Sequence, residues 1–348
     1  MAYTTIDNPF KFFNTVLWAG NSDSTRNITG VGFQPDLVWV KNRSLASDHR
    51  MANAVRGANK GLVPNGTDAE DTSTTAVKSF LSDGIEIGNE QSFNRNGDNH
   101  VGWFWKANGS GSSNTAGDIN STVSANTTSG FSIVQYTGNG STNQTVGHGL
   151  GVVPSFIIVK QTNTTRNWPT YTQALGNGVA FLDINDAWAG SSSYQNYWYT
   201  SGMTTTTFGI SNNDNTNASG GTFIAYVFAN VKGYCKVGSY TGNGNSNGAF
   251  VYTGFKPAFI IFKRSDAAEN WGLMDNRLRP ANGVGNNYIY PDLNNAQDST
   301  SDFDMLSNGF KTRTASNFIN GSGATYLYIA IAESPFVTSG TKAAGTAR

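Results

Sequence analysis

Three blocks of sequence occur three times along the chain, in the same order and at nearly the same spacing. The first block is a short run that contains an aromatic residue and ends in a Gly/Asn turn. The second block is an X-Pro pair followed by an apolar run, and the third is a closing apolar run. From Trp18, Tyr136 and Tyr240 in the first block to Pro35, Pro154 and Pro257 in the second, the separations are 17, 18 and 17 residues. From these prolines to Trp103, Ala225 and Tyr328 in the third block they are 68, 71 and 71 residues. Such self-similarity predicts three copies of one structural unit.

Each block has the pattern of a β-strand or a tight turn. Gly and Asn accept the positive φ of hairpin turns, and proline suits the first residue of a strand. The apolar runs are too short for helices, and a charged fraction of 13% disfavours long surface helices. The runs after the prolines end at Lys41, Lys160 and Lys263, whose side chains we expect to reach solvent. We predict an all-β chain of three tandem antiparallel β-sandwich units of jelly-roll or lectin-like type.

The spacing and composition also predict the domain boundaries. We expect a leader at 1–12, repeats at 13–107, 130–230 and 231–337, a Ser/Thr/Asn/Gly-rich linker at 108–129, and a flexible tail at 338–348. The linker is predicted because 108–129 offers almost nothing apolar to bury. The leader is too short for a separate anchoring domain.

Charge and cysteine usage exclude several classes of protein. Lys+Arg 23 balances Asp+Glu 23, so a nucleic-acid groove or a polybasic membrane surface is not expected. The single cysteine, Cys235, excludes an intrachain disulfide framework. The start of the sequence lacks a signal-peptide pattern, and the longest apolar run, 223–229, is far shorter than a membrane span. We expect a soluble protein made in a cytoplasm.

The residues that carry most enzyme chemistry are sparse. His49, His100 and His148 form no close ligand pair, and we expect His148 to be a loop imidazole bonded to a backbone carbonyl. The sequence has no nucleophile elbow, phosphate-binding loop or dinucleotide fingerprint. We therefore predict no enzyme activity, no cofactor and no metal. Calcium at Asp183 and Asp186, or around 212–215, is left open as an alternative.

Two further groups of residues are candidates for function. Paired carboxylates could serve glycan cleavage, although solvated loop acids explain them equally well. The pairs are Asp183 with Asp186, Asp302 with Asp304, and Asp68 with Glu70. An aromatic cluster could stack on sugar rings if it lies in a loop, whereas a strand would place its tryptophan in the core. Its members, the candidate glycan or receptor contacts, are Tyr194, Tyr197, Trp198 and Tyr199.

Several longer phrases resemble a family of tandem-repeat bacteriophage virion proteins, common in tailed phages of marine bacteria and cyanobacteria. They are Phe33-Gln-Pro-Asp-Leu-Val-Trp-Val-Lys-Asn-Arg-Ser, Val55-Arg-Gly, Ser121-Thr-Val-Ser-Ala-Asn, Gly130-Phe-Ser-Ile-Val-Gln-Tyr-Thr-Gly-Asn-Gly, Val146-Gly-His-Gly-Leu-Gly and Ala330-Ile-Ala-Glu-Ser-Pro-Phe. The resemblance covers roughly residues 13 to 337 and implies a structural protein of the particle. The first repeat departs from the Ala-Glu-Ser-Pro-Phe ending, so its equivalent surface can differ.

The resemblance leads to three hypotheses about function. The first is a non-enzymatic tail-fibre or spike component, located in the virion after assembly in the host cytoplasm. The second is a capsid decoration, head fibre or connector, and the third is a glycan-hydrolysing tailspike. The expected partners are other virion proteins, a host-surface glycan or protein, and further copies of the chain. Fibres are typically trimeric, and because the sequence has no heptads, a homotrimer would form through β-domain faces.

Overall fold

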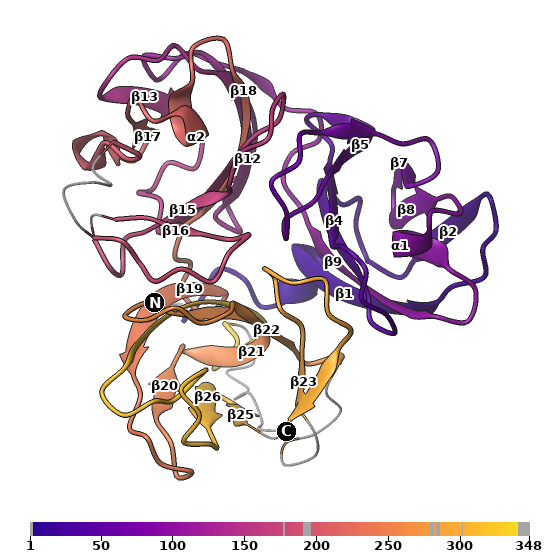
Figure 1. Cartoon of the computed structure of the whole chain (residues 1–348), viewed down its shortest axis with the longest axis vertical. Coiled ribbons are helices and arrows are strands. Elements are labelled where there is room, and N and C mark those ends of the chain that lie inside the picture. Colours follow the sequence, from indigo (N-terminus) through magenta and orange to yellow (C-terminus); the bar gives the residue numbers. More distant parts are fainter. Residues whose placement is uncertain are drawn as a thin grey trace.

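The structure is a computed structural model that describes residues 3–176, 178–190, 196–278, 282, 286–300 and 302–339. The described chain is almost entirely β, and its paired strands are antiparallel. This confirms the predicted all-β fold class. Figure 1 shows three lobes arranged around a common centre. No helix in the described ranges is long and apolar enough to cross a membrane.

The first lobe, unit 1 (13–107), has a six-stranded sheet facing a three-stranded sheet. Its elements are β1 (Phe13–Ala19), β2 (Arg26–Thr29), β3 (Leu37–Asn42), β4 (Arg50–Asn53), β5 (Gly57–Leu62), β6 (Asp71–Thr72), β7 (Val77–Leu81), β8 (Gly84–Ile87), α1 (Gln91–Asn94) and β9 (Asn99–Trp105). The large sheet has the order β1-β9-β3-β4-β5-β6, and the small one β2-β8-β7. A short 3-10 turn, η1 (Pro9–Lys11), precedes β1.

Unit 2 (108–230) repeats this plan with a seven-stranded and a two-stranded sheet. Its elements are β10 (Ser112–Asn114), β11 (Ser121–Asn126), β12 (Phe131–Thr137), β13 (Gln144–Gly147), β14 (Phe156–Gln161), β15 (Pro169–Thr172), β16 (Ala180–Phe181), η3 (Thr200–Gly202), β17 (Thr207–Ile210), α2 (Asp214–Asn217) and β18 (Thr222–Phe228). The large sheet has the order β10-β11-β12-β18-β14-β15-β16, and β13 pairs with β17.

Unit 3 (231–337) has a four-stranded sheet, a three-stranded sheet and one separate strand pair. Its strands are β19 (Cys235–Thr241), β20 (Phe250–Tyr252), β21 (Phe255–Arg264), β22 (Gly272–Asp275), β23 (Asn286–Tyr288), β24 (Asp298–Thr300), β25 (Phe303–Leu306), β26 (Gly309–Thr312) and β27 (Thr325–Pro335). The sheets run β19-β27-β21-β22 and β20-β26-β25, and β23 pairs with β24.

The three sequence blocks occupy matching places in the three large sheets. The strand triplets β1-β9-β3, β12-β18-β14 and β19-β27-β21 all place the closing strand between the other two. The register corrects the alignment of the closing block by one residue, because Trp103 corresponds to Tyr226 and Ile329 rather than to Ala225 and Tyr328. Each of these residues pairs with the same position of the middle block: Trp39 with Trp103, Ile158 with Tyr226, and Ile261 with Ile329. A slip of one residue would exchange the two faces of the strand.

The expectation of a flexible or extended linker at 108–129 is wrong for most of that segment, which forms two strands of the large sheet. Strand β11 pairs with β12 along six positions, and β10 continues the sheet beyond it. Asn108 N donates to Ser124 Oγ at 2.8 Å, and Ser124 is fully buried. Backbone hydrogen bonds to neighbouring strands order both segments, so a composition poor in apolar residues did not reveal them.

The leader and the start of the tail pack together on unit 3. Ile6 is buried in the core, and Thr4 Oγ1 donates to Lys232 O at 2.7 Å. Ser339 donates through its backbone N to Asp7 and through its hydroxyl to Thr4 O. Within the predicted flexible tail, residues 338 and 339 therefore lie against the leader, and 340–348 fall outside the described residues.

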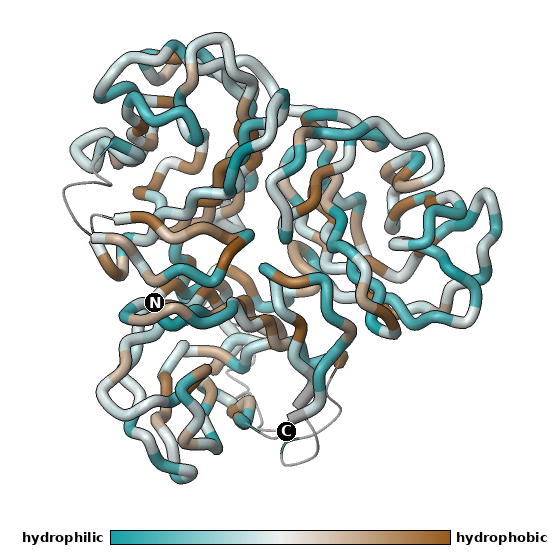
Figure 2. Tube along the Cα trace, in the orientation of Figure 1, coloured by the Kyte–Doolittle hydropathy of each residue, from teal (hydrophilic) through white to brown (hydrophobic). Residues whose placement is uncertain are grey.

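The strands of the second sequence block, β3, β14 and β21, are buried on both faces. In β3, Leu37 and Trp39 belong to a core shared by all three units, whereas Val38 and Val40 belong to the interior of unit 1. Strand β14 divides its residues in the same way between the shared core and the interior of unit 2. Figure 2 shows hydrophobic segments inside each lobe and where the lobes meet. This double burial explains why these strands are continuous apolar runs rather than alternating ones.

The shared core closes around an apolar cavity of about 20 Å³ to which each unit contributes four residues. The lining consists of Leu37, Trp39, Met51 and Trp105, of Phe156, Ile158, Tyr226 and Phe228, and of Phe259, Ile261, Ile329 and Ile331. Phe259 of unit 3 contacts Phe13, Trp103 and Trp105 of unit 1, with ring centroids 5.2, 6.0 and 5.6 Å apart. The three units are thus one packed body.

Replacing Phe259 by alanine is expected to destabilise all three units together. Removing a fully buried ring leaves a cavity and costs about 3–5 kcal/mol of unfolding free energy. We expect a single unfolding transition at lower urea concentration, followed by both tryptophan fluorescence and circular dichroism. The control is Phe250→Ala, because Phe250 is 48% exposed. Two separate transitions in the Phe259→Ala variant would contradict a shared core.

Candidate functional site

The predicted aromatic cluster lies mainly inside unit 2. Tyr197 and Trp198 are 8% and 6% exposed, and their rings pack against Phe181 and Tyr171, each with centroids 5.7 Å apart. A glycan contact by these two rings is therefore wrong for this structure, because neither ring offers a free face. Tyr199 is half-buried, and its role as a contact stays a prediction. Tyr194 lies outside the described residues.

The carboxylate pairs do not form paired sites. Asp183 is buried and accepts hydrogen bonds from Trp168 N and Asn167 Nδ2, both at 2.8 Å, whereas Asp186 is exposed. Burial raises the pKa of Asp183, and the two hydrogen bonds oppose that rise. Its carboxylate thus fixes the start of β15. This arrangement gives no support to glycan cleavage or calcium binding by Asp183 and Asp186 together.

In each of the other two pairs, one carboxylate forms an ion pair with an arginine. Glu70 lies 2.6 Å from Arg56 Nη1, and Asp68 is exposed. Asp304 is buried against the Arg313 guanidinium at the edge of β25. Asp302, one residue before that strand, accepts a backbone hydrogen bond from Arg313 through its carbonyl. The guanidinium ions satisfy the carboxylates as structural contacts.

The three histidines are buried and bond backbone carbonyls. His148 Nδ1 accepts from Leu150 N at 3.1 Å, so Nε2 carries the proton and faces Thr204 O at 3.3 Å. This is the loop imidazole that the sequence predicts. Burial lowers the pKa of His49 to about 3 and also lowers that of His100 and His148. The three imidazoles are thus held in the neutral form.

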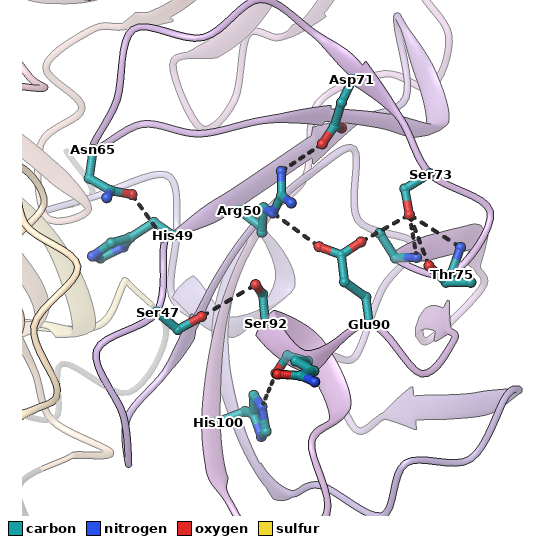
Figure 3. A network of polar contacts seen from close by, with 12 residues as sticks. Ser47, His49, Arg50, Asn65, Asp71, Ser73, Thr75, Glu90, Ser92 and His100 are labelled. Carbon is teal, nitrogen blue, oxygen red and sulfur yellow. Dashed lines mark hydrogen bonds and ion pairs between the residues drawn. The ribbon is translucent and has the colours of Figure 1, made fainter.

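A polar network in unit 1, drawn in Figure 3, is held by one arginine. Arg50 lies 2.7 Å from Asp71 Oδ2 and 3.0 Å from Glu90 Oε1, and Ser73 Oγ donates to the other oxygen of Glu90 at 2.9 Å. These contacts connect β4, β6 and the turn before α1. The carboxylates are engaged by partners of the same unit, so the network stabilises the fold around Arg50.

The Asn-rich segment considered for calcium is a helix cap. Asn213 accepts from Asn215 N at 2.9 Å at the start of α2, and Asn217 Nδ2 donates to Ser141 O at 2.8 Å. Within the described ranges, no group of three or more His, Cys, Asp or Glu side chains could hold a metal ion.

Asn217 belongs to a threefold set of buried asparagines that the sequence analysis missed. In each unit one asparagine side chain accepts a hydrogen bond from the backbone of the Gly-Asn turn that follows the first strand. The pairs are Asn21 N with Asn94 Oδ1, Asn139 N with Asn217 Oδ1, and Asn243 N with Asn320 Oδ1, at 3.1, 2.9 and 2.9 Å. Their constant place, five residues before β9, β18 and β27, is the signal that could have revealed them.

The most organised polar feature is a set of three junctions between the units. At each junction a loop of one unit and a strand end of the next exchange two backbone hydrogen bonds. Arg166 N and Glu70 N donate to Thr67 O and Thr162 O, Glu269 N and Trp188 N to Asn185 O and Ser265 O, and Ser47 N and Gln297 N to Asn294 O and Arg43 O. Unit 1 thus binds unit 2, unit 2 binds unit 3, and unit 3 binds unit 1, which closes a ring.

A ring nitrogen strengthens each junction from the same place in the repeat. The residues are His49, Trp168 and Trp271. Each lies six positions after the strand-end residue whose carbonyl accepts a junction hydrogen bond, which is Arg43, Thr162 or Ser265. Trp168 Nε1 donates to Gly66 O at 2.9 Å, Trp271 Nε1 to Phe181 O at 2.8 Å, and His49 Nε2 to Tyr290 O at 3.1 Å. His49 Nε2 is the donor because Nδ1 accepts a hydrogen bond from Trp39 Nε1 at 2.9 Å, which leaves the ring proton on Nε2.

The expectation that the strand-end lysines reach solvent is wrong. Lys41, Lys160 and Lys263 are fully buried at the junctions. Lys160 Nζ donates to Thr67 O of unit 1 at 2.8 Å, and Lys263 Nζ to Asn185 O of unit 2 at 3.2 Å. The Lys41 ammonium bonds carbonyls of its own unit. Burial lowers the pKa of each amine to about 8, against the attraction of nearby carboxylates. Backbone carbonyls at the strand end thus replace the water that was expected there.

One buried carboxylate also crosses between units. Asp275 of unit 3 accepts from Thr15 Oγ1 at 2.7 Å and from Trp103 Nε1 at 3.1 Å, both in unit 1. Burial raises its pKa to about 6, although the hydrogen bonds lower it. At the equivalent place in the repeat, Asn53 Nδ2 donates to Tyr226 Oη of unit 2 at 2.9 Å. These bonds fix the rotation of neighbouring sheets around the shared core.

Lys160→Met is expected to reduce the rise of stability with pH between about 8 and about 10. The folded pKa of about 8 lies below the ordinary 10.5, so the unfolded chain binds more protons in this window. The free energy of unfolding therefore increases with pH. Urea denaturation at several pH values measures the rise, and Lys106→Met, at an exposed lysine, is the control. An unchanged rise in Lys160→Met would contradict the argument.

Asp275→Asn is expected to remove a loss of stability between about pH 4 and pH 6. Because the folded pKa of about 6 exceeds the ordinary 3.8, the folded chain binds more protons in this window. The free energy of unfolding consequently falls as pH rises. Thermal unfolding across this range, compared with wild type and with Asp186→Asn at an exposed carboxylate, tests the difference. The idea fails if Asp275→Asn and wild type give parallel pH profiles.

Comparison with known proteins supplies a family. A search of curated proteins found no match. One family, described as "Domain of unknown function (DUF7483)", matches residues 8–335, which include the three large sheets and all three junctions. Because this match spans most of the sequence, the chain belongs to the DUF7483 family of domains of unknown function.

Proposed function

We propose that the chain is a non-enzymatic structural protein of a tailed-bacteriophage virion, a tail-fibre or spike component that contacts the host surface. The observation that carries the proposal is the ring of three repeated units closed within one chain. Its building blocks include the phrases that resemble phage virion proteins: the 33–44 phrase contains β3, the 130–140 phrase contains β12, and the 330–336 phrase covers the end of β27.

The way this chain uses its reactive groups supports a structural role. Its buried lysines and histidines bond backbone carbonyls, and the buried Asp183 and Asp275 accept hydrogen bonds that hold strands in place. Buried groups that are hydrogen-bonded in this way make a fold rigid. A rigid body displayed in many copies can hold a cell surface through individually weak contacts.

Capsid decoration is the second candidate, favoured by the approximate threefold arrangement of the lobes (Figure 1). A body with this arrangement fits a threefold position of a shell, since its three faces can meet three similar neighbours. The shared core already buries the inner sheet faces within one chain. A homotrimer, which we also propose, would therefore form through outer surfaces instead of these faces.

The location of the protein tests both candidates. We expect mass spectrometry to find the chain in purified particles of the phage that encodes it, and electron microscopy with a labelled antibody to place it on the tail. Labelling of the capsid would replace the first candidate by the second. Its absence from particles would overturn both. Shortening of host polysaccharide by the purified chain would instead establish the glycan-hydrolysing tailspike.

A further inference from the structure

Unit 3 differs from the other two units at one strand of its small sheet. Strands β2, β13 and β20 are equivalent, because each centres on a buried residue paired with another buried residue. The pairs are Ile28 with Ile85, Val146 with Phe208, and Val251 with Phe310. The flanking residues are Asn27 and Thr29 in unit 1, Thr145 and Gly147 in unit 2, and Phe250 and Tyr252 in unit 3. Only unit 3 places aromatic rings there.

These two rings are open to solvent. Phe250 and Tyr252 are 48% and 49% exposed, and they are the aromatic members of the exposed large hydrophobic residues in the described part of the chain. Because the two residues are two positions apart in a strand, their side chains leave the same face of the strand at a separation of roughly 7 Å. Folding does not require these rings, because the equivalent strands of units 1 and 2 form without them. Exposed aromatic faces of this kind mark binding surfaces.

Tyr252 also forms one wall of a groove between unit 3 and the leader. The groove has a volume of about 620 Å³. Its lining includes Tyr3, Lys232, Lys236, Tyr252 and Gly254. Two lysines and no carboxylate line it, so the groove is cationic in a chain whose formal net charge is zero.

Each lysine of the groove lies over an aromatic ring. Lys236 Nζ is 5.4 Å from the centroid of Tyr252 and donates to Tyr252 O at 2.8 Å. Lys232 Nζ is 4.8 Å from the centroid of Tyr3. Such cation–π contacts hold both ammonium groups near the rings while leaving them in contact with water. The positive charge and the flat apolar surfaces are therefore presented together.

Gly254 lets the two tyrosines meet. Tyr3 Oη donates to Gly254 O at 2.5 Å, and Gly254 has a φ of +83°. A Cβ at this position would lie 3.1 Å from Tyr3 Oη and 3.5 Å from Tyr252 Oη. The missing side chain and the left-handed backbone thus leave room for both phenol oxygens beside Gly254 in the lining of the groove.

We propose that this groove and the adjacent aromatic pair bind an acidic carbohydrate, with a hexuronic acid unit as the recognised element. The C–H face of the sugar would stack on Tyr252, and its carboxylate would pair with Lys236 and Lys232. The exposed ring of Phe250 extends the platform for a neighbouring sugar. The inference deepens the proposed function, on which it rests for the source of the glycan at the host surface.

Binding of the purified full-length chain to tetragalacturonate tests the proposal by titration calorimetry. The carboxyl-reduced tetrasaccharide is the neutral counterpart. We expect the acidic sugar to bind at least tenfold more tightly than the neutral one. Lys236→Gln is expected to weaken binding of the acidic sugar at least tenfold, because one cation is lost. Tyr252→Ser is expected to do the same through the loss of the stacking face.

Matched variants separate binding from folding. Lys106→Gln and Val152→Ser remove an exposed lysine and an exposed apolar residue outside the groove, and both are expected to keep wild-type affinity. Thermal unfolding of Lys236→Gln and Tyr252→Ser should match wild type, because both side chains reach solvent. If their midpoints fall, Phe250→Ser, farther from the leader, repeats the test with its own midpoint measured.

Three outcomes would overturn the proposal. The first is that the chain binds both tetrasaccharides with equal affinity, or binds neither of them. The second is sulfate binding as tightly as tetragalacturonate, which would leave stacking without a role. The third is concentration-dependent dimerisation in sedimentation that Phe250→Ser abolishes, which would make the aromatic pair a contact between copies. Each result concerns the purified chain, so it is distinguishable from absence of the protein in virions.

Discussion

The structure depends on strands whose two faces are both apolar. A sheet such as that of unit 1 buries Val38 and Val40 against its own small sheet, and it still has Leu37 and Trp39 to cover on the other side. Exposing such a surface would cost about 25 cal/mol for each Å² of apolar area. One unit alone therefore cannot hide both faces, whereas three sheets around one centre can. Association of the units is part of folding.

Directional contacts decide how the sheets are arranged around that centre, because apolar packing alone tolerates several rotations. The paired backbone hydrogen bonds at each junction fix how one unit is turned against the next, and Lys160 and Lys263 add a cost to any arrangement that removes their acceptors in the neighbouring unit. An ammonium group at Lys160 without Thr67 O would be a buried charge lacking one of its acceptors. We infer that these charges contribute more to the choice of one arrangement than to net stability, as buried ionic groups do in some proteins.

The sequence was sufficient for the repeats, the strand type and the antiparallel sheets, because turn residues and short apolar runs report local geometry. It did not show which groups cover each strand in the folded protein. The run ending at Lys41 predicts a buried strand, but nothing in it shows that the lysine meets carbonyls instead of water. Strand β11 was missed because its order comes from backbone pairing with β10 and β12 rather than from an apolar run. The aromatic residues at 197 and 198 were candidates for binding because composition cannot distinguish a loop from a core.

Departures from the threefold pattern are the informative positions in a chain of this kind. Where the repeat must close the ring, a substitution keeps the contact: His49 replaces a tryptophan and still bonds a carbonyl of the neighbouring unit. Packing thus constrains these positions in all three copies. The two positions that flank Val251 in β20 carry no such constraint, since their counterparts in units 1 and 2 are polar or small. In unit 3 they expose Phe250 and Tyr252 to solvent. A costly exposed residue that the fold does not require is best explained by a ligand, and the lysines beside Tyr252 indicate that this ligand is anionic.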